Sequence, residues 1–505
     1  MVCLPVVRPG EESNDLKRVR GTVEAGILLV VLLLAAGCGS SGSGGPASTG
    51  RGAPSSPRCE SGTLGMETVA LSRQLRKELA LSDDFQGAVV SEVFPGGPAS
   101  AAGVQPDDIV EQVESSRITN DCDFVSAGYS RACEPVRIVL RRAGAALEVT
   151  VVPVDQEAFL EERCREGIPS ACFRRAWSFW NRNQGIDRQY ALELYETACQ
   201  AGSAEACASA GHNLMASPDR AKDAIALLER SCELRSGAGC AHLAFLSATG
   251  KLAKKDDRRA TQLYVRSCDL GDALGCYNVG LMAEQGRGGA RNFSRAVAKY
   301  DEACAAGSST ACTNLGFLYE KGTGVKKDGA RAVALYQRGC DGTRCQPSNL
   351  GGCLNVGRAY RDGIGVERDP KRAASIFQPA CDREPPPEDV GAEENRSRAC
   401  SLLGALYLAG HGVEKDPGKG RELSELGCER GDAFGCFNAA VTEPDPARAA
   451  SFLDRACQAG DGEGCHDLGV AYEKGSGVAR DRRRAAELLR KACQLGFAKA
   501  CGKKR

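Results

Sequence analysis

Paired cysteines recur at a nearly constant interval through the last two-thirds of this 505-residue chain. Phrases such as CREGIPSAC, CQAGSAEAC, CDLGDALGC, CERGDAFGC and CQAGDGEGC share one form, in which two cysteines enclose seven residues. The first cysteines of successive pairs are 29 to 47 residues apart, and 36 is the commonest interval. A period of this length predicts stacked copies of one small unit rather than a single globular core.

The segment 312–340 shows what one copy contains. Residues such as Leu315 and Tyr319 give a first short helix an apolar face, and the glycines within 322–324 interrupt it, because glycine adopts conformations that other residues avoid. A second apolar run at helical spacing, 332–336, leads to the next cysteine. Each copy is therefore predicted to be an αα-hairpin that buries its apolar face against its neighbours.

Each cysteine pair brackets the junction between two predicted hairpins. In seven of the ten junctions a glycine follows the first cysteine by three residues, at Gly167, Gly202, Gly271, Gly307, Gly431, Gly460 and Gly496. A helix C-terminus favours a left-handed residue at this position. The second cysteine then opens the following helix, close enough to bridge back to the first.

These pairs are predicted to be disulfides, each contributing roughly 2–3 kcal/mol in the chain-entropy model. The alternative is reduced, buried cysteines that act as small apolar side chains. Zinc is disfavoured, because close C-x-x-C spacing and clustered histidines are missing. The predicted bridges join Cys164 to Cys172, Cys199 to Cys207, Cys232 to Cys240, Cys268 to Cys276, Cys304 to Cys312, Cys340 to Cys353, Cys381 to Cys400, Cys428 to Cys436, Cys457 to Cys465 and Cys493 to Cys501.

A longer phrase accompanies the cysteines, most clearly LGFLYEKGTGVKKD (315–328), VGRAYRDGIGVERD (356–369), LGALYLAGHGVEKD (403–416) and LGVAYEKGSGVARD (468–481). It resembles the Sel1-like repeat, a relative of the tetratricopeptide repeat, and in particular the Helicobacter cysteine-rich proteins. The resemblance implies an all-α solenoid. The units after Cys207 and Cys436 lack the G-x-G-V loop, and the junctions after Cys340 and Cys381 carry insertions.

Charge and cysteine content limit the function classes. Lysine plus arginine equals aspartate plus glutamate, 65 each, and no basic stripe with interleaved aromatic residues occurs, which argues against nucleic acid as the main partner. Twenty-six cysteines, mostly in pairs, indicate an oxidising compartment. The spacing does not determine the disulfide partners of four of them, Cys59, Cys122, Cys133 and Cys345.

The N-terminus indicates how the chain reaches that compartment. A basic leader precedes the apolar run 25–36, which is short for a transmembrane helix but suits a signal peptide. The small residues before Cys38 resemble the bacterial lipoprotein box, although Ala35 stands where leucine is usual. The resemblance implies a signal peptide at 1–37 and lipidation of Cys38; an uncleaved anchor and ordinary secretion are the alternatives. Residues 38–58, rich in glycine, serine and proline, are predicted to be a flexible tether.

Residues 60–155 have the pattern of a small β/α domain. A β-branched run, a glycine-proline turn and an alanine-rich helix occupy 87–113, and 136–154 predicts two strands that meet near Gly144. The phrase PGGPASAAGVQPDDIV resembles the PDZ domains of HtrA proteases, which implies that an extended peptide adds to a sheet edge while backbone amides hold its carboxylate.

By this resemblance, Leu64, Gly65 and Met66 form the carboxylate-binding loop, the following strand at 67–70 pairs with the ligand, and a helix with Phe124 forms the other groove wall. The alternative is that Leu64 to Met66 simply begin a strand and that Phe124 is a core residue.

No catalytic constellation is apparent. HtrA enzymes need a serine-nucleophile domain, and neither G-x-S-x-G nor G-N-S-G-G precedes the PDZ-like segment. Cysteine-rich Sel1-like proteins have been described as β-lactamases or penicillin binders, but S-x-x-K, S-D-N and K-T-G are all missing. The histidines, His212, His242, His411 and His466, are interpreted as isolated surface or groove residues, with His466 exposed at a helix start. Trp177 and Trp180 are interpreted as packing at the solenoid end rather than as a ligand platform.

The sequence therefore predicts a multidomain chain: a small PDZ-like β/α domain at 60–155, then an all-α solenoid of about nine Sel1-like αα-hairpins at 156–505. We expect a non-enzymatic, lipid-anchored scaffold of the bacterial cell envelope, facing the periplasm and favouring the outer membrane. Its partner is expected to be a protein or peptide, with no nucleic acid, metal or cofactor. A β-lactamase or penicillin-binding hydrolase is the alternative.

Overall fold

The computed structural model describes residues 62–501, apart from most of 72–84 and of 120–133 and from 182–184, 253, 342–348 and 383–391. The described residues divide into two compact units, and the main division of the chain falls between Ser308 and Ser309. The predicted signal peptide, the predicted lipidation site Cys38 and the predicted tether lie outside the described residues. Within the described part of the chain, no helix combines the length and the apolar character needed to cross a bilayer.

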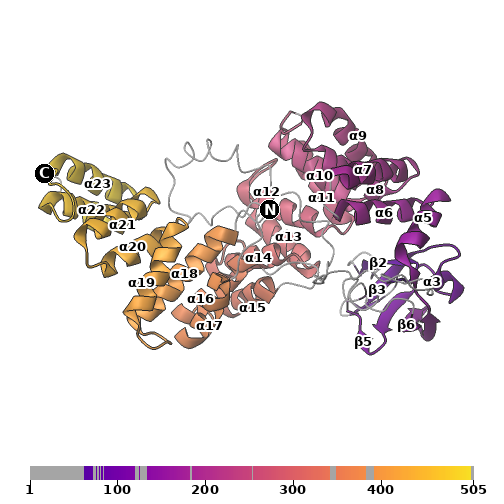
Figure 1. The fold of residues 1–505 in the computed structure, drawn as a ribbon, viewed down its shortest axis with the longest axis horizontal. Helices are drawn as coiled ribbons and strands as arrows, with labels where there is room; N and C mark the ends of the chain where they lie inside the picture. Colours follow the sequence, from indigo (N-terminus) through magenta and orange to yellow (C-terminus); the bar gives the residue numbers. More distant parts are fainter. Residues whose placement is uncertain are drawn as a thin grey trace, which may run out of the picture. The chain divides into compact units, whose positions relative to one another are not determined.

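A β domain begins the first unit (Figure 1). Its antiparallel main sheet has the strand order β2-β3-β4-β6-β7, and β5 pairs with β4. One face of this sheet carries the buried core, including Val90, Val110 and Ile138. The elements are β1 (Gly62–Thr63), β2 (Met66–Ala70), β3 (Ala88–Val93), α3 (Pro98–Ala101), β4 (Ile109–Val113), β5 (Ser116–Arg117), β6 (Val136–Arg142), β7 (Ala145–Val151) and β8 (Val154–Asp155). The two strands predicted to meet near Gly144 are thus confirmed as β6 and β7.

Helices make up the rest of the first unit. They are α5 (Gln156–Arg165), α6 (Pro169–Asn181), α7 (Gly185–Gln200), α8 (Ala204–Leu214), the 3₁₀ turn η3 (Pro218–Arg220), α9 (Ala221–Glu233), α10 (Gly237–Thr249), α11 (Asp257–Asp269), α12 (Ala273–Gln285) and α13 (Phe293–Ala305). From α6 onward, each even-numbered helix packs on the odd-numbered helix that follows it, as a hairpin.

The second unit continues the same pattern. Its helices are α14 (Ser309–Lys321), α15 (Gly329–Asp341), α16 (Leu350–Asp362), α17 (Pro370–Asp382), α18 (Ala392–Ala409), α19 (Pro417–Glu429), α20 (Ala433–Thr442), α21 (Pro446–Gln458), α22 (Gly462–Lys474), α23 (Arg482–Gln494) and α24 (Ala498–Cys501). The described residues therefore contain nine hairpins, four in the first unit and five in the second, which confirms the predicted number. The two hairpins that lack the glycine loop have short first helices, α8 and α20.

The helix ends follow from local sequence. Asp256, Asp416 and Asp481 each accept a backbone N–H in the first turn of the helix that they precede, as N-cap residues do. All seven predicted C-terminal glycines adopt a left-handed backbone, with φ between 83° and 102°. In the junction after Cys232, Arg235 takes the same conformation at a φ of 67°.

The predicted disulfides are present. Nine bridges join the expected partners across the hairpin junctions, with Cα–Cα distances of 4.4 to 4.9 Å. Cys304 and Cys312 are also disulfide-bonded. Sequence analysis missed the glycine that directly precedes several second cysteines. A Cβ at Gly239 would lie 2.1 Å from the Ser231 Oγ and one at Gly275 would lie 2.2 Å from the Ser267 Oγ, so only glycine allows the two helices to approach there.

Candidate functional site

Strand β2 lies at the edge of the main sheet, and its one partner strand among the described residues is β3. The short loop before β2 contains Leu64 and Gly65, and Gly65 has a left-handed φ of 70°. A Cβ at Gly65 would lie 2.8 Å from the Pro98 Cδ, so both the backbone conformation and the close approach require glycine. A sheet edge with unpaired backbone groups is where an extended peptide can add as a further strand.

The turn at 94–98 holds this loop in place. The amide of Phe94 donates to the carbonyl of Gly65 at 2.9 Å, and the amide of Ala99 donates to the carbonyl of Leu64 at 2.8 Å. Within the loop, the Gly65 amide faces the Thr63 Oγ1 at 3.3 Å. The loop is therefore fixed by backbone hydrogen bonds from both sides of the turn.

The predicted groove residues come together in the core of the β domain. Leu64, Met66 and Phe124 are all buried and belong to one apolar cluster with Val113 and Ile138. This places Phe124 on the side of β2 that was predicted for the groove, but as part of the packed interior. The rest of the predicted groove helix lies outside the described residues.

The other face of β2 carries charge and meets the first hairpin of the solenoid. Glu67 on β2 and Glu92 on β3 lie directly opposite each other in the sheet. The Arg174 Nε donates to Glu67 at 2.6 Å, and the Ser170 Oγ donates to Glu92 at 2.6 Å. Burial raises the pKa of Glu92, and the neighbouring carboxylates of Glu67 and Glu205 raise it further, against the hydrogen bond from Ser170 and the charge of Arg174.

Helix α5 anchors the solenoid to the β domain. Phe159 lies 6.1 Å from Phe94, ring centre to ring centre, and both are buried in a small cluster with Leu160 and Ala171. A Cβ at Gly97 would lie 3.0 Å from the Phe159 ring, so a larger residue there would require the ring to shift. The turn that fixes the loop at Leu64 and Gly65 is therefore packed directly against the first helix after the β domain.

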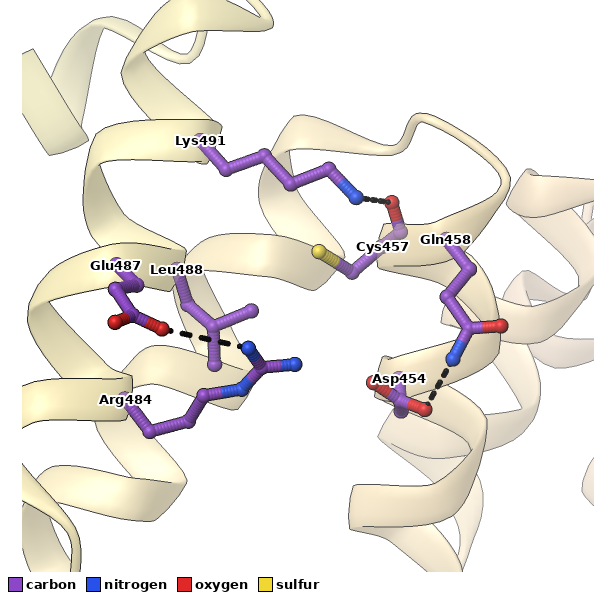
Figure 2. Close-up of a pocket in the computed structure, with 7 residues that line it drawn as sticks. All are labelled: Asp454, Cys457, Gln458, Arg484, Glu487, Leu488 and Lys491. Atoms are coloured by element: carbon purple, nitrogen blue, oxygen red, sulfur yellow. Dashed lines mark hydrogen bonds and ion pairs between the residues drawn. The ribbon is translucent and has the colours of Figure 1, made fainter.

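A hollow of about 270 Å³ in the second unit is lined by residues of α21 and α23, which are drawn in Figure 2. Its polar side chains are already engaged with one another: Arg484 pairs with Glu487 at 3.4 Å, and Gln458 donates to Asp454 at 2.5 Å. Cys457 at its base is in a disulfide. These polar side chains therefore already have partners within the fold.

Lys491 in this hollow belongs to a recurring contact that sequence analysis missed. Its Nζ donates to the carbonyl of Cys457 at 2.7 Å, which caps the C-terminal end of the preceding α21. Residues two positions before a first cysteine do the same elsewhere: Arg266 donates to the carbonyl of Cys232 at 2.9 Å, Arg455 to that of Cys428 at 2.7 Å and Arg230 to that of Gln200 at 3.1 Å. The sequence signal for this contact is the lysine or arginine that stands two residues before the first cysteine in several repeats.

The interpretation of the histidines as isolated was wrong for two of them. His212 on α8 and His242 on α10 stack, with ring centres 4.5 Å apart. The Nδ1 of His212 is buried with no hydrogen-bond partner among the described residues. Burial lowers the pKa of His212 to about 4, helped by the charge of Lys251, and lowers the pKa of His242 to about 3. Adjacent hairpins bring the two rings together, and their spacing in the sequence does not reveal it.

The other sequence candidates have packing roles. His466 is half-buried rather than exposed, with its Nδ1 2.8 Å from Asp467 and its ring against Phe497. His411 is exposed. Trp177 and Trp180 pack against the apolar cluster of the first hairpins, which confirms the packing interpretation.

One group of potential metal ligands converges among the described residues: Cys268, Cys276 and Glu302. The two cysteines form a disulfide with each other, and the Lys299 ammonium lies 2.8 Å from Glu302. A disulfide sulfur is not a thiolate ligand, and a neighbouring ammonium disfavours a cation. This group therefore does not suit a metal in the oxidised protein.

Comparison with known proteins separates the two parts of the chain. The Sel1 repeat model matches residues 169–203, 237–272, 273–308, 309–343, 351–384, 397–432, 437–461 and 462–497. The Helicobacter pylori cysteine rich protein B is 33% identical over 25% of this chain and 93% of that one, with a TM-score of 0.23. A Sel1 repeat protein from Oxalobacter formigenes is 19% identical over 65% of this chain and 91% of that one, with a TM-score of 0.46.

A curated relative is similar over a shorter stretch. Serine protease HTRA1B of Danio rerio is 32% identical over 95 residues, which are 18% of this chain and 20% of that protein. The chain thus spans about a fifth of the length of this relative.

The repeats and the disulfides carry the assignment. The eight matched segments together cover more than half of the chain and overlap eight of the nine hairpins, all but α8–α9. Proteins of this kind are in general non-enzymatic scaffolds that mediate protein–protein contacts. The disulfides indicate a location outside the cytoplasm. The chain belongs to the Sel1 repeat family.

Proposed function

We propose that this chain is a cell-envelope lipoprotein that acts as a protein- and peptide-binding scaffold through a PDZ-like domain and a Sel1-repeat solenoid. The observation that carries the proposal is the edge of β2, which lies beside the glycine-dependent loop at Leu64–Met66. A ligand strand adds to β2 and its terminal carboxylate meets the amides of this loop. Its last side chain packs at the edge of the apolar cluster to which Leu64, Met66 and Phe124 belong.

The solenoid supplies a second, larger surface. Among the described residues, the strongest contacts of each hairpin are with neighbouring hairpins, and disulfides fasten the junctions, so repeated surfaces are available to a protein partner. The lipid anchor at Cys38 and the tether 38–58 would hold both parts at a distance from the membrane. The partner is a protein or peptide of the envelope.

The peptide function is tested with the full-length oxidised protein and decapeptides that end in a large apolar residue. We expect binding that requires a free carboxylate, so the same peptide with an amidated C-terminus should lose at least tenfold in affinity, a difference of about 1.4 kcal/mol. Equal affinity for acid and amide, or no binding of either, would refute the peptide site. A Gly65→Glu variant is a poor probe, because any side chain at Gly65 collides with Pro98.

The anchor is tested separately in cells. Labelling with a palmitate analogue should mark the wild-type chain and should leave a Cys38→Ser variant unmarked and released from the membrane fraction. Cys59→Ser is the matched control and should keep both the label and the membrane association.

A further inference from the structure

Helix α6 of the solenoid lies across the outer face of the β2–β3 pair, opposite the core. Ser170 contacts Glu92 on β3, and Arg174, one turn later, contacts Glu67 on β2. One turn of helix rises about 5.4 Å, close to the spacing of about 4.8 Å between neighbouring strands. The helix therefore crosses from β3 to β2 in the direction of the sheet edge.

The next turn of α6 extends past β2. Trp177 and Ser178 lie one turn beyond Arg174 on the same side of the helix, and both are half-buried. A strand added to β2 would lie about one strand spacing further out, beneath this turn. Ala171 of α6 belongs to the same buried cluster as Phe94 and Phe159, which holds the start of α6 against the β domain.

The charges under α6 do not balance. The carboxylates of Glu67 and Glu205 both act on that of Glu92, and the guanidinium of Arg174 opposes them. The side chains of Arg174 and Glu67 are 28% and 21% exposed, and Glu205 is exposed, so a ligand can reach this group. The net charge is negative and therefore favours a cation.

Side chains of an added strand alternate between the two faces of the sheet. When the last residue of the ligand points to the apolar side with Met66 and Phe124, the next-to-last residue points to the outer face, toward Glu67. Building on the proposed peptide site, we infer that α6 forms its second wall and that Glu67, Glu92 and Glu205 select ligands with lysine or arginine as the next-to-last residue.

The test compares three decapeptides that differ only in a next-to-last lysine, alanine or glutamate, each with a free carboxylate and an apolar last residue. We expect the full-length protein to bind the lysine peptide roughly five- to tenfold more tightly than the glutamate peptide, in line with about 1 kcal/mol for exposed charge pairs. The preference should shrink at high salt, because exposed charges are screened.

Two variants locate the effect. Glu205→Gln changes an exposed residue of α8 and should reduce the lysine preference while leaving the affinity of the alanine peptide nearly unchanged. Glu67→Gln changes β2 itself and should also reduce the lysine preference. Glu233→Gln, on the exposed side of α9, is the matched control and should keep the full preference.

The outcomes separate the two proposals. If the peptides bind through their carboxylates but lysine and glutamate are equal, or if both glutamine variants keep the preference, the role of α6 and its acidic group is refuted and the peptide site stands. If no peptide binds, or if amidation changes nothing, the peptide site itself is refuted and the selection of a basic residue fails with it.

Discussion

Arg235 occupies the position where seven other junctions carry glycine. Its φ of 67° lies in the left-handed region, which costs a residue with a Cβ roughly 1–2 kcal/mol. Arg235→Gly should therefore stabilise the hairpins on either side of Cys232, by up to about 1 kcal/mol once the greater freedom of glycine in the unfolded chain is included. Denaturant unfolding of the oxidised protein measures the change. Arg258→Gly, near the start of α11, is the control and should destabilise.

The stacked pair His212 and His242 predicts a loss of stability in acid. Both pKa values are lowered in the folded state, to about 4 and about 3, while an unfolded histidine titrates near about 6.5. The unfolded chain thus binds more protons as the pH falls below about 6.5, and stability drops progressively until the folded pKa values are passed. At about pH 5 each imidazole should cost on the order of 2 kcal/mol relative to neutral pH.

A double variant, His212→Phe with His242→Phe, keeps two stacked rings and removes the titration. Its free energy of unfolding should change less between about pH 7 and pH 5 than that of the wild type. A His411→Phe variant is the control, because His411 is exposed and should leave the pH dependence intact. If the double variant loses as much stability between about pH 7 and pH 5 as the wild type, the histidine pair does not cause the loss of stability in acid.

At the scale of the elements, the second glycine of the G-x-G-V loop lets one hairpin pack closely against the preceding one, as Gly412 shows. Gly412 has a φ of 75°, and its Cβ would lie 2.3 Å from the Lys371 amide nitrogen, in the first turn of α17. Gly431, at the junction after Cys428, has a φ of 91° and open space around its Cβ. The two glycines therefore share the backbone conformation and differ in the close contact.

This pair gives a controlled prediction. Gly431→Ala should cost only the left-handed strain, roughly 1–2 kcal/mol, whereas Gly412→Ala should add an overpacking cost of about 1–3 kcal/mol. Denaturant unfolding of the second unit, followed by circular dichroism, compares the two variants. Equal destabilisation would mean that the loop does not seat on α17 as the structure places it.

What the sequence could predict depends on whether an element is local. The hairpins, the left-handed glycines and the bridges between neighbouring cysteines all follow from residues close in the chain, and the structure confirms them. The stacking of His212 on His242 and the placement of Arg174 over Glu67 join separate elements. No spacing rule reveals such pairs, because they depend on how hairpins pack. The sequence predicted the adjacent strands β6 and β7, whereas it did not predict the contact of α6 with the sheet.

At the scale of the whole molecule, the array is a chain of near-neighbour contacts fastened at each junction. In such a stack, stability is a sum of hairpin terms and of interfaces between adjacent hairpins. A bridge that closes a span of eight residues contributes about 2.5 kcal/mol in the chain-entropy model, and it acts only on the hairpins that it joins. Removing one bridge should therefore loosen the array locally and leave distant hairpins unchanged.

The pair Cys457→Ala with Cys465→Ala tests this locality, because that bridge lies between the interior helices α21 and α22. We expect faster amide hydrogen exchange in α20 to α23, by up to about two orders of magnitude if the full 2.5 kcal/mol is lost, and unchanged exchange in α9 to α12. Removing Cys493 and Cys501 is the matched control: that bridge holds only the short terminal α24, so exchange should rise there alone. Faster exchange throughout both units after the interior change would show that the array unfolds as one cooperative body, against the near-neighbour description.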